Sequence, residues 1–268
     1  MPPLSSSPTL AEILALDPGP GDTWQGHSPP EQRARVFGGQ VVAQALAAAT
    51  ATVPEQHRVH SLHAYFLRGG DVEVPITYEV DRLRDGRSFS ARQVTAGQGD
   101  GAILVLSASF HGGGTGGDFE APAPEGVPGP DGLPPTRFGE RGIIEARDAS
   151  WDQPATPQRR IWFRVPTELD PRLHAAGVAY ATDHGPFGAA RRIVDRVGEG
   201  RFDSLFRASL DHAIWFHRPP RIDDWVLYDI EAVAHRDDRI LTSGRIVDAE
   251  GRRVATVAQE ILAREPGR

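Results

Sequence analysis

The sequence contains no cysteine and no lysine, and its single methionine is Met1. A chain without cysteine has no disulfide framework, no thiolate nucleophile and no thiolate ligand for zinc or an iron–sulfur cluster. The lack of lysine excludes Schiff-base chemistry and a P-loop lysine. Every permanently positive side chain is therefore an arginine. Any ionic contact with an anionic ligand must come from arginine, assisted at most by a protonated histidine.

Long apolar runs and an excess of positive charge are also missing. The 268 residues carry a formal net charge of −7, with a pI of about 5.8, which argues against general binding to nucleic acid. The N-terminal residues lack the basic and apolar regions of a secretory signal, and no apolar run approaches the roughly 20 residues that span a bilayer. We therefore expect a cytoplasmic protein with no membrane span and no nucleic-acid partner.

One segment differs from the rest of the chain in composition. Of the 25 residues in 111–135, 14 are glycine or proline. Such a composition buries little apolar surface and is typical of a linker. The sequence therefore predicts a first unit over 1–110, a linker over 111–140 and a second unit over 141–268.

The two units resemble each other when the sequence is shifted by 150 positions. No gap is needed to keep the matches in step. The matches are Phe37-Gly38 with Phe187-Gly188, Phe66-x-Arg68 with Phe216-x-Arg218, Tyr78-x-Val80 with Tyr228-x-Ile230, Gly101 with Gly251 and Ala108 with Ala258. The common offset favours two copies of one supersecondary unit over two unrelated domains with chance matches.

Each copy has the pattern of a helix followed by antiparallel strands. Apolar residues at helical spacing predict a helix after Gly38-Gly39 that continues to Ala49, and a second helix from near Asp183 to Gly198. The predicted strands are 61–67, 74–82, 88–96 and 102–110 in the first copy, and 210–217, 225–233, 239–247 and 253–262 in the second. This pattern indicates an α+β fold, with a sheet wrapped around an apolar helix in each unit.

Several long runs resemble one known family. The runs are VFGGQVVAQAL (36–46), VHSLHAYFLRGGD (59–71), LRDGRSFSARQV (83–94), DHAIWFHRP (211–219) and VAQEIL (257–262). They resemble the type II acyl-CoA thioesterases, the TesB-like family, over residues 10 to 264. The resemblance implies a double hotdog fold, which agrees with the repeat. It also implies hydrolysis of fatty acyl-CoA to free fatty acid and coenzyme A, without a metal or other cofactor.

The resemblance further implies three site residues that together hold and activate a water molecule. They are the aspartate Asp183, the hydroxyl of Ser209, where many relatives have threonine, and the amide of Gln259. Their counterparts at the 150-residue offset are Arg33, Val59 and Ser109. Because the first copy lacks the trio, we expect one active site per chain, built mainly from the second copy.

Each member of the trio also has a structural interpretation. Asp183 could be a helix N-cap, and the two roles are compatible because a carboxylate stays ionised beside a helix N-terminus. Ser209 could be an ordinary strand residue, since no GxSxG elbow surrounds it. Gln259 shares a strand face with apolar neighbours, so it needs hydrogen-bond partners unless it lies at a solvent-exposed edge.

Histidine offers other chemistries. His63 and His212 lie in predicted strands without metal-ligand spacing, so satisfied structural histidines are favoured and no metal site is expected. An enoyl-CoA hydratase of the hotdog class has an Asp followed several residues later by a His, whereas His184 follows Asp183 directly. The remaining alternative is an acyl-CoA binding or sensing module without turnover.

The substrate contacts are less well defined by the sequence. The Gly38-Gly39 turn at a helix start is a candidate for binding the thioester oxyanion. The coenzyme A phosphates require arginine, and the candidates are Arg68, Arg191-Arg192 and Arg218. The family resemblance also implies a homodimer or homotetramer. The acyl chain-length preference does not follow from the sequence.

Overall fold

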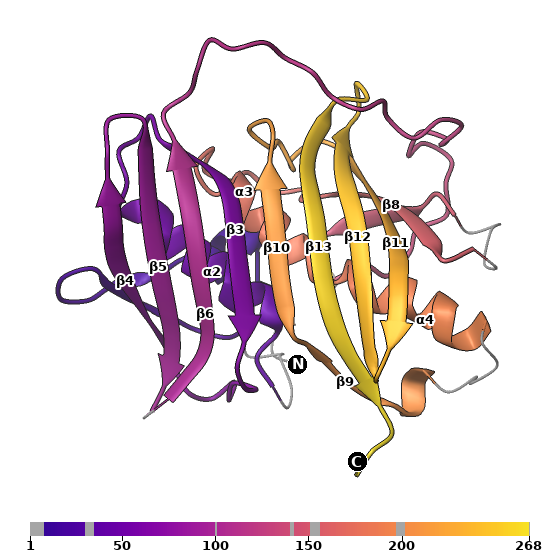
Figure 1. Ribbon diagram of the computed structural model, residues 1–268, viewed down its shortest axis with the longest axis horizontal. Coiled ribbons are helices and arrows are strands. Elements are labelled where there is room, and N and C mark those ends of the chain that lie inside the picture. The colour runs from indigo at the N-terminus through magenta and orange to yellow at the C-terminus, as the bar shows by residue number, and fades with distance from the viewer. Residues whose placement is uncertain are drawn as a thin grey trace, which may run out of the picture.

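The computed structural model describes residues 8–29, 35–99, 101–139, 142–150, 156–196 and 202–267. These residues form a 13-stranded antiparallel sheet, and its principal helices pack behind one face of it (Figure 1). Along the sheet the strand order is β1-β2-β4-β5-β6-β3-β10-β13-β12-β11-β8-β7, and β9 pairs with β13. The elements are α1 (Leu10–Leu14), β1 (Asp17–Pro18), β2 (Thr23–Gly26), α2 (Gly38–Ala51), β3 (Arg58–Phe66), β4 (Ile76–Asp85), β5 (Phe89–Gln98), β6 (Gly101–His111), β7 (Glu145–Asp148), β8 (Gln158–Arg164), α3 (His174–Thr182), α4 (Gly185–Arg196), the 3₁₀ turn η1 (Phe202–Ser204), β9 (Phe206–Ser209), β10 (Asp211–Phe216), β11 (Val226–Arg236), β12 (Arg239–Asp248) and β13 (Arg253–Arg264).

The sheet has a pseudo-two-fold axis between its two central strands. β3 and β10 pair antiparallel, and His63 of β3 lies opposite Ala213 of β10, 150 positions further along the chain. On either side of this pair the strand order runs outward in corresponding fashion, through β6, β5, β4 and β2 or through β13, β12, β11 and β8. The strand repeat expected from the sequence is therefore present, and the two units share one continuous sheet.

Helix α2 is the buried helix expected in the first unit. Of its 14 residues, 11 are buried, which is possible because small alanine side chains let the sheet and α3 approach closely. Its buried glutamines are tied into the core. Gln44 Nε2 donates to the carbonyl oxygen of Ile13 at 2.6 Å, and the Tyr78 hydroxyl donates to Gln44 Oε1 at 2.7 Å.

The second unit contains a helix that the sequence analysis missed. The predicted helix near Asp183 is α4, whose expected end at Gly198 lies outside the described residues, but α3 precedes it and is completely buried. The N-terminus of α2 meets the C-terminus of α3, since a side chain at Gly39 would contact the carbonyl oxygen of Tyr180. The helix equivalent to α2 is therefore α3. The match of Phe37-Gly38 with Phe187-Gly188 joined non-equivalent helices, and α4 and η1 are additions to the second unit.

The predicted strands are present, with differences at their ends. The strand expected over 210–217 is β10, and the short strand β9, which was not predicted, precedes it across a break at Leu210. At that break the Leu210 N–H donates to the carbonyl of Glu260, and the Phe66 N–H donates to the carbonyl of Leu210. The sequence analysis missed the outer strands β1, β2, β7 and β8. They extend the two ends of the sheet beyond β4 and β11.

The glycine- and proline-rich segment after β6 crosses one end of the sheet and then runs beside the second unit (Figure 1). Ala123, Val127 and Leu133 of this segment pack against a small apolar cluster that includes Trp162. The Trp162 indole N–H also donates to the carbonyl of Pro128 at 2.8 Å. The segment therefore contributes packing to the second unit.

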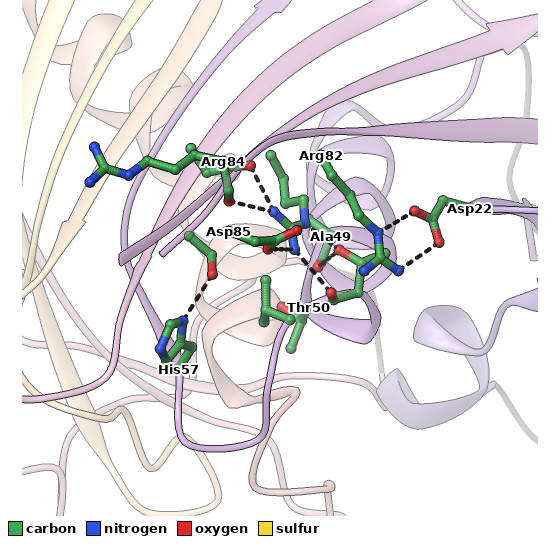
Figure 2. A network of polar contacts seen from close by, with 12 residues as sticks. Asp22, Ala49, Thr50, His57, Arg82, Arg84 and Asp85 are labelled. Carbon is green, nitrogen blue, oxygen red and sulfur yellow. Dashed lines mark hydrogen bonds and ion pairs between the residues drawn. The ribbon is translucent and has the colours of Figure 1, made fainter. Parts of the chain in front are cut away.

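A network of polar contacts in the first unit includes Arg84 and Asp85 of β4 (Figure 2) and a buried arginine, Arg92. The Arg92 side chain is fully buried in β5 and donates to Thr52 Oγ1 at 2.6 Å and to the Thr52 carbonyl at 3.0 Å. It also donates to the Arg84 carbonyl at 2.9 Å and to Asp85 Oδ1 at 2.5 Å. Beside it, the Arg82–Asp22 ion pair is partly exposed.

In the part of the chain that the structure describes, no helix has the length and apolar character needed to cross a membrane.

Candidate active site

A cavity of about 390 Å³ lies where the two units meet. Its lining includes Gly38 at the start of α2, Asp183 at the end of α3 and Ser209 at the end of β9. The apolar lining residues are Val36, Phe37, Val41, Phe66, Leu67, Ile103, Phe187, Phe206, Ala208 and Leu210. The cavity therefore combines an apolar wall with a few polar groups, as small-molecule sites commonly do.

Asp183 lies in the short break between α3 and α4. It is the C-cap residue of α3, two residues before α4 begins, so its interpretation as a helix N-cap is wrong. The residue is 2% exposed. Its Oδ1 faces Ser209 and Gln259, whereas a Cβ added at Gly38 would lie 3.0 Å from its Oδ2. The carboxylate thus has one oxygen in a polar network and the other beside the N-terminus of α2.

The structure brings the three site residues expected from the sequence together. Ser209 Oγ donates to Asp183 Oδ1 at 2.9 Å, and Gln259 Nε2 donates to the same oxygen at 2.5 Å. The Gln259 amide also donates to Ser209 Oγ at 2.9 Å. Gln259 is 1% exposed on the inner face of β13, which excludes a solvent-exposed edge. Gln259 does not line the cavity itself, but it contacts Asp183 and Ser209, which do.

A histidine supports this network from behind. His212 is completely buried in β10, and its Nδ1 is hydrogen-bonded to Gln259 Oε1 while its Nε2 lies 3.0 Å from Thr182 Oγ1. Burial lowers the pKa of His212, which favours the neutral ring. Because Gln259 Oε1 can only accept, the neutral ring must carry its proton on Nδ1. The expectation of a satisfied His212 is correct, but its link to Gln259 was missed.

The two glycines proposed at a helix start are placed differently. Gly38 lines the cavity, and a side chain there would press on Phe66 at 2.8 Å and on Asp183 at 3.0 Å. Gly39 is buried, and a Cβ there would lie 2.7 Å from the Tyr180 carbonyl oxygen. Gly39 is therefore required for close packing of α2 on α3, and only Gly38 faces the cavity.

Three arginines line the cavity. They are Arg68, which the sequence singled out, and Arg35 and Arg207, which it did not. Arg191, a further candidate, is held by Asp203, and Arg192 donates to backbone and side-chain oxygens of Ser150. The last candidate, Arg218, follows β10 and pairs with Asp118 and Glu120, and it does not line this cavity. Among the described residues no group of three or more His, Cys, Asp or Glu side chains could hold a metal ion.

His184 lies directly behind Phe37 and next to Asp183. Its ring stacks on Phe37 with centroids 4.1 Å apart, and its buried Nε2 has no hydrogen-bond partner among the described residues. Burial lowers the pKa of His184 from 6.5 to about 4, although the Asp183 carboxylate opposes this shift. The structure thus holds the ring neutral.

This burial predicts a pH dependence of stability. Between pH 6.5 and about 4 the unfolded chain binds a proton at His184 that the folded chain does not, so stability falls as the pH falls through this window. Above pH 6.5 the contribution is fully present. We expect His184→Phe to flatten this decline, as measured by urea unfolding from pH 7 to 4.5. Parallel curves for the two proteins would contradict the assignment.

Comparisons with known proteins agree with this architecture. Residues 27–111 match the family model described as the acyl-CoA thioesterase N-terminal domain, and residues 119–263 match that of the C-terminal domain. A crystal structure from Alicyclobacillus acidocaldarius, described as having a hot dog fold, shares 19% identity with a TM-score of 0.77 and covers 95% of this chain and 97% of that one. Two such units in one sheet make this chain a double hotdog protein.

Closer relatives define the family. The chain is 33% identical over 280 residues to Acyl-CoA thioesterase 2 of Haemophilus influenzae, with 95% of this chain and 96% of that protein covered. It is 37% identical to the acyl-CoA thioesterase II TesB2 of Mycobacterium marinum, with a TM-score of 0.85 and coverage of 97% and 99%. The chain belongs to the acyl-CoA thioesterase family.

Proposed function

We propose that the protein hydrolyses fatty acyl-CoA to free fatty acid and coenzyme A. The observation that carries this proposal is the hydrogen-bonded trio of Asp183, Ser209 and Gln259 at the wall of an apolar cavity. Family membership supports the choice of an acyl-CoA substrate. Arg35, Arg68 and Arg207 supply the positive charge that the phosphates require.

The proposed chemistry uses a water molecule as the nucleophile. The Ser209 hydroxyl and the Gln259 amide donate to Asp183 Oδ1, which fixes the carboxylate and leaves Oδ2 to accept a proton. Water held at Oδ2 loses a proton to Asp183 as its oxygen attacks the thioester carbonyl carbon. The tetrahedral oxyanion then collapses and breaks the C–S bond. The leaving thiolate recovers the proton from Asp183, so no covalent acyl-enzyme forms.

The N-terminus of α2 is the proposed stabiliser of the oxyanion. The first N–H groups of a helix have no intrahelical partner, and the helix dipole favours negative charge at this end. Gly38 lines the cavity beside Asp183 Oδ2, so its N–H lies near the position of the attacking water. Positioned donors of this kind stabilise charge that develops in the transition state.

The test is release of free thiol from acyl-CoA by the purified protein, with a series of chain lengths. Thiol release that saturates with substrate is expected. Binding of acyl-CoA without thiol release would favour the alternative of a binding or sensing module. Addition of water to enoyl-CoA without hydrolysis would favour a hydratase. Either result would overturn the proposed function.

We propose that His212 is a positioning residue for Gln259. His212→Phe keeps an aromatic ring but removes the donor to Gln259 Oε1, so the amide is free to turn away from Asp183. We expect kcat to fall by roughly tenfold to 100-fold, as for other supporting groups behind a site, with KM little changed. His212→Asn retains a donor near the Nδ1 position and should recover part of kcat. Equal losses in both variants would contradict a positioning role.

We also propose that the protein works in the cytoplasm as a homodimer or homotetramer. Support for self-association comes from the outer face of the central strands, where Tyr65 of β3 and Trp215 of β10 are 61% and 38% exposed. Exposed aromatic side chains of this kind are enriched at protein interfaces. Light scattering coupled to gel filtration would measure the oligomeric state.

A further inference from the structure

A second cavity, of about 290 Å³, lies in the position related to the active site by the pseudo-two-fold axis. The active-site cavity is lined by the segments 66–70 and 206–210, and the second cavity by the segments 216–220 and 56–60. Every one of these ten positions has its counterpart 150 residues away. The second cavity is therefore lined by the segments that correspond to those around the site at Asp183.

The helices repeat this correspondence. The start of α2 lines the active-site cavity with Gly38 and Val41, and the start of α3 lines the second cavity with Ala175. The two cavities are thus equivalent places at opposite ends of the α2–α3 pair.

The second cavity lacks the groups for hydrolysis. At the C-cap of α2, where α3 has Asp183, the chain has Thr52, and this residue accepts hydrogen bonds from the buried Arg92 guanidinium. Where the active site has Ser209, the second cavity has Val59. The second cavity therefore lacks the Asp–Ser pair that the active-site cavity places on its wall.

The second cavity nevertheless keeps the features that bind an anionic ligand with an apolar arm. Arg58, Arg172 and Arg218 line it, whereas Glu55 is the one carboxylate among its described lining residues. Four histidines also line the cavity: His57, His60, His111 and His217. Val59 and Phe216 supply apolar surface.

One arginine is kept at the same position in both cavities. Arg68 of the active-site cavity corresponds to Arg218 of the second, but their surroundings differ. Arg218 contacts Asp118 at 2.9 Å and Glu120 at 3.5 Å, both from the segment between the units. Within the described residues Arg68 has no carboxylate partner. An anion entering the second cavity would compete with these two carboxylates for Arg218.

We propose that this second cavity binds a coenzyme A-type ligand, either coenzyme A or an acyl-CoA, without hydrolysing it. The phosphates would contact the arginines, and the pantetheine arm would lie along Val59 and Phe216. The choice of ligand rests on the proposed function, because the cavity is the counterpart of the proposed acyl-CoA site. The binding itself is independent of turnover at Asp183.

Isothermal titration of the full chain with coenzyme A tests this proposal through a matched pair of blocking variants. Ser209→Trp fills the active-site cavity, and Val59→Trp fills the corresponding place in the second. Coenzyme A should still bind one site in Ser209→Trp, which loses hydrolysis. In Val59→Trp that site should be lost while hydrolysis is retained. Absence of binding to a folded Ser209→Trp variant would overturn the proposal.

Charge variants on the surface test the proposal independently, in case the tryptophan variants misfold. Arg58 is exposed, and Arg58→Glu should weaken binding at the second site at least tenfold without changing hydrolysis. Removal of the competing charges by Asp118→Asn with Glu120→Gln should raise the affinity of the second site for coenzyme A. Unchanged affinity in both variants would refute the proposal. If the wild-type chain bound coenzyme A at the second site but released no thiol from acyl-CoA, the proposed function would fail and this inference would stand.

Discussion

Replacing Asp183 by asparagine is expected to lower kcat for acyl-CoA hydrolysis by about 100-fold to 10,000-fold. The asparagine side chain has nearly the same shape, and its carbonyl oxygen can still accept from Ser209 Oγ and Gln259 Nε2. It cannot take a proton from water. The substitution therefore removes the proposed base while the surrounding hydrogen bonds remain, and thiol release under saturating substrate measures the loss.

A second buried carboxylate provides the matched control. Asp229 in β11 is almost fully buried and accepts from Arg245 at 2.9 Å and from Arg160 at 3.2 Å. Asp229→Asn also removes one buried negative charge, but this residue does not line the cavity at Asp183. We expect lower stability with kcat retained. A kcat for Asp183→Asn equal to that of the wild type would exclude Asp183 as the base.

Replacing Arg92 by methionine is expected to lower the free energy of unfolding by about 3–5 kcal/mol. Methionine fills much of the volume, so the main loss is the set of hydrogen bonds that the guanidinium donates. The Thr52 carbonyl and hydroxyl oxygens and the Arg84 carbonyl would be left without this donor. Buried groups without partners cost more than the net value of the bonds. Urea unfolding measures the change.

Arg82 is the control for this substitution because it pairs with Asp22 in the same region (Figure 2). Its side chain is 48% exposed, so water and salt screen the pair. Arg82→Met should cost less than about 1 kcal/mol. Equal costs for the two variants would mean that burial of Arg92 does not set its contribution.

The eight inner strands and helix α4 could be predicted because their faces differ in polarity, whereas α2, which is mostly buried, was predicted from its apolar spacing after Gly38-Gly39. Helix α4 has exposed positions such as Arg191 and Asp195 beside buried Ala190 and Val194, so its periodicity is visible in the sequence. Helix α3 is buried on every side and has no polar face, so its alanine-rich sequence lacks that periodic signal. The same absence hid the true partner of α2.

The candidate site shows a similar division. Family motifs identified Asp183, Ser209 and Gln259, and Gln259 was also conspicuous as a polar residue on an apolar strand face. His212 could not be linked to Gln259 from spacing alone. That contact depends on the pairing of β10 with β13, which places residues 47 positions apart next to each other. Long-range register of this kind is a property of the folded sheet.

The Gly/Pro-rich segment between β6 and β7 has a consequence for how the two halves can change over evolution. In a symmetric dimer of single units, every substitution would appear at both interfacial cavities at once. Here the corresponding positions of the two cavities are different residues of one chain. Ser209 lines one cavity, and Val59 lines the corresponding place in the other. Covalent fusion therefore frees each cavity to be selected separately. A duplicated unit can lose its reactive groups without inactivating its twin.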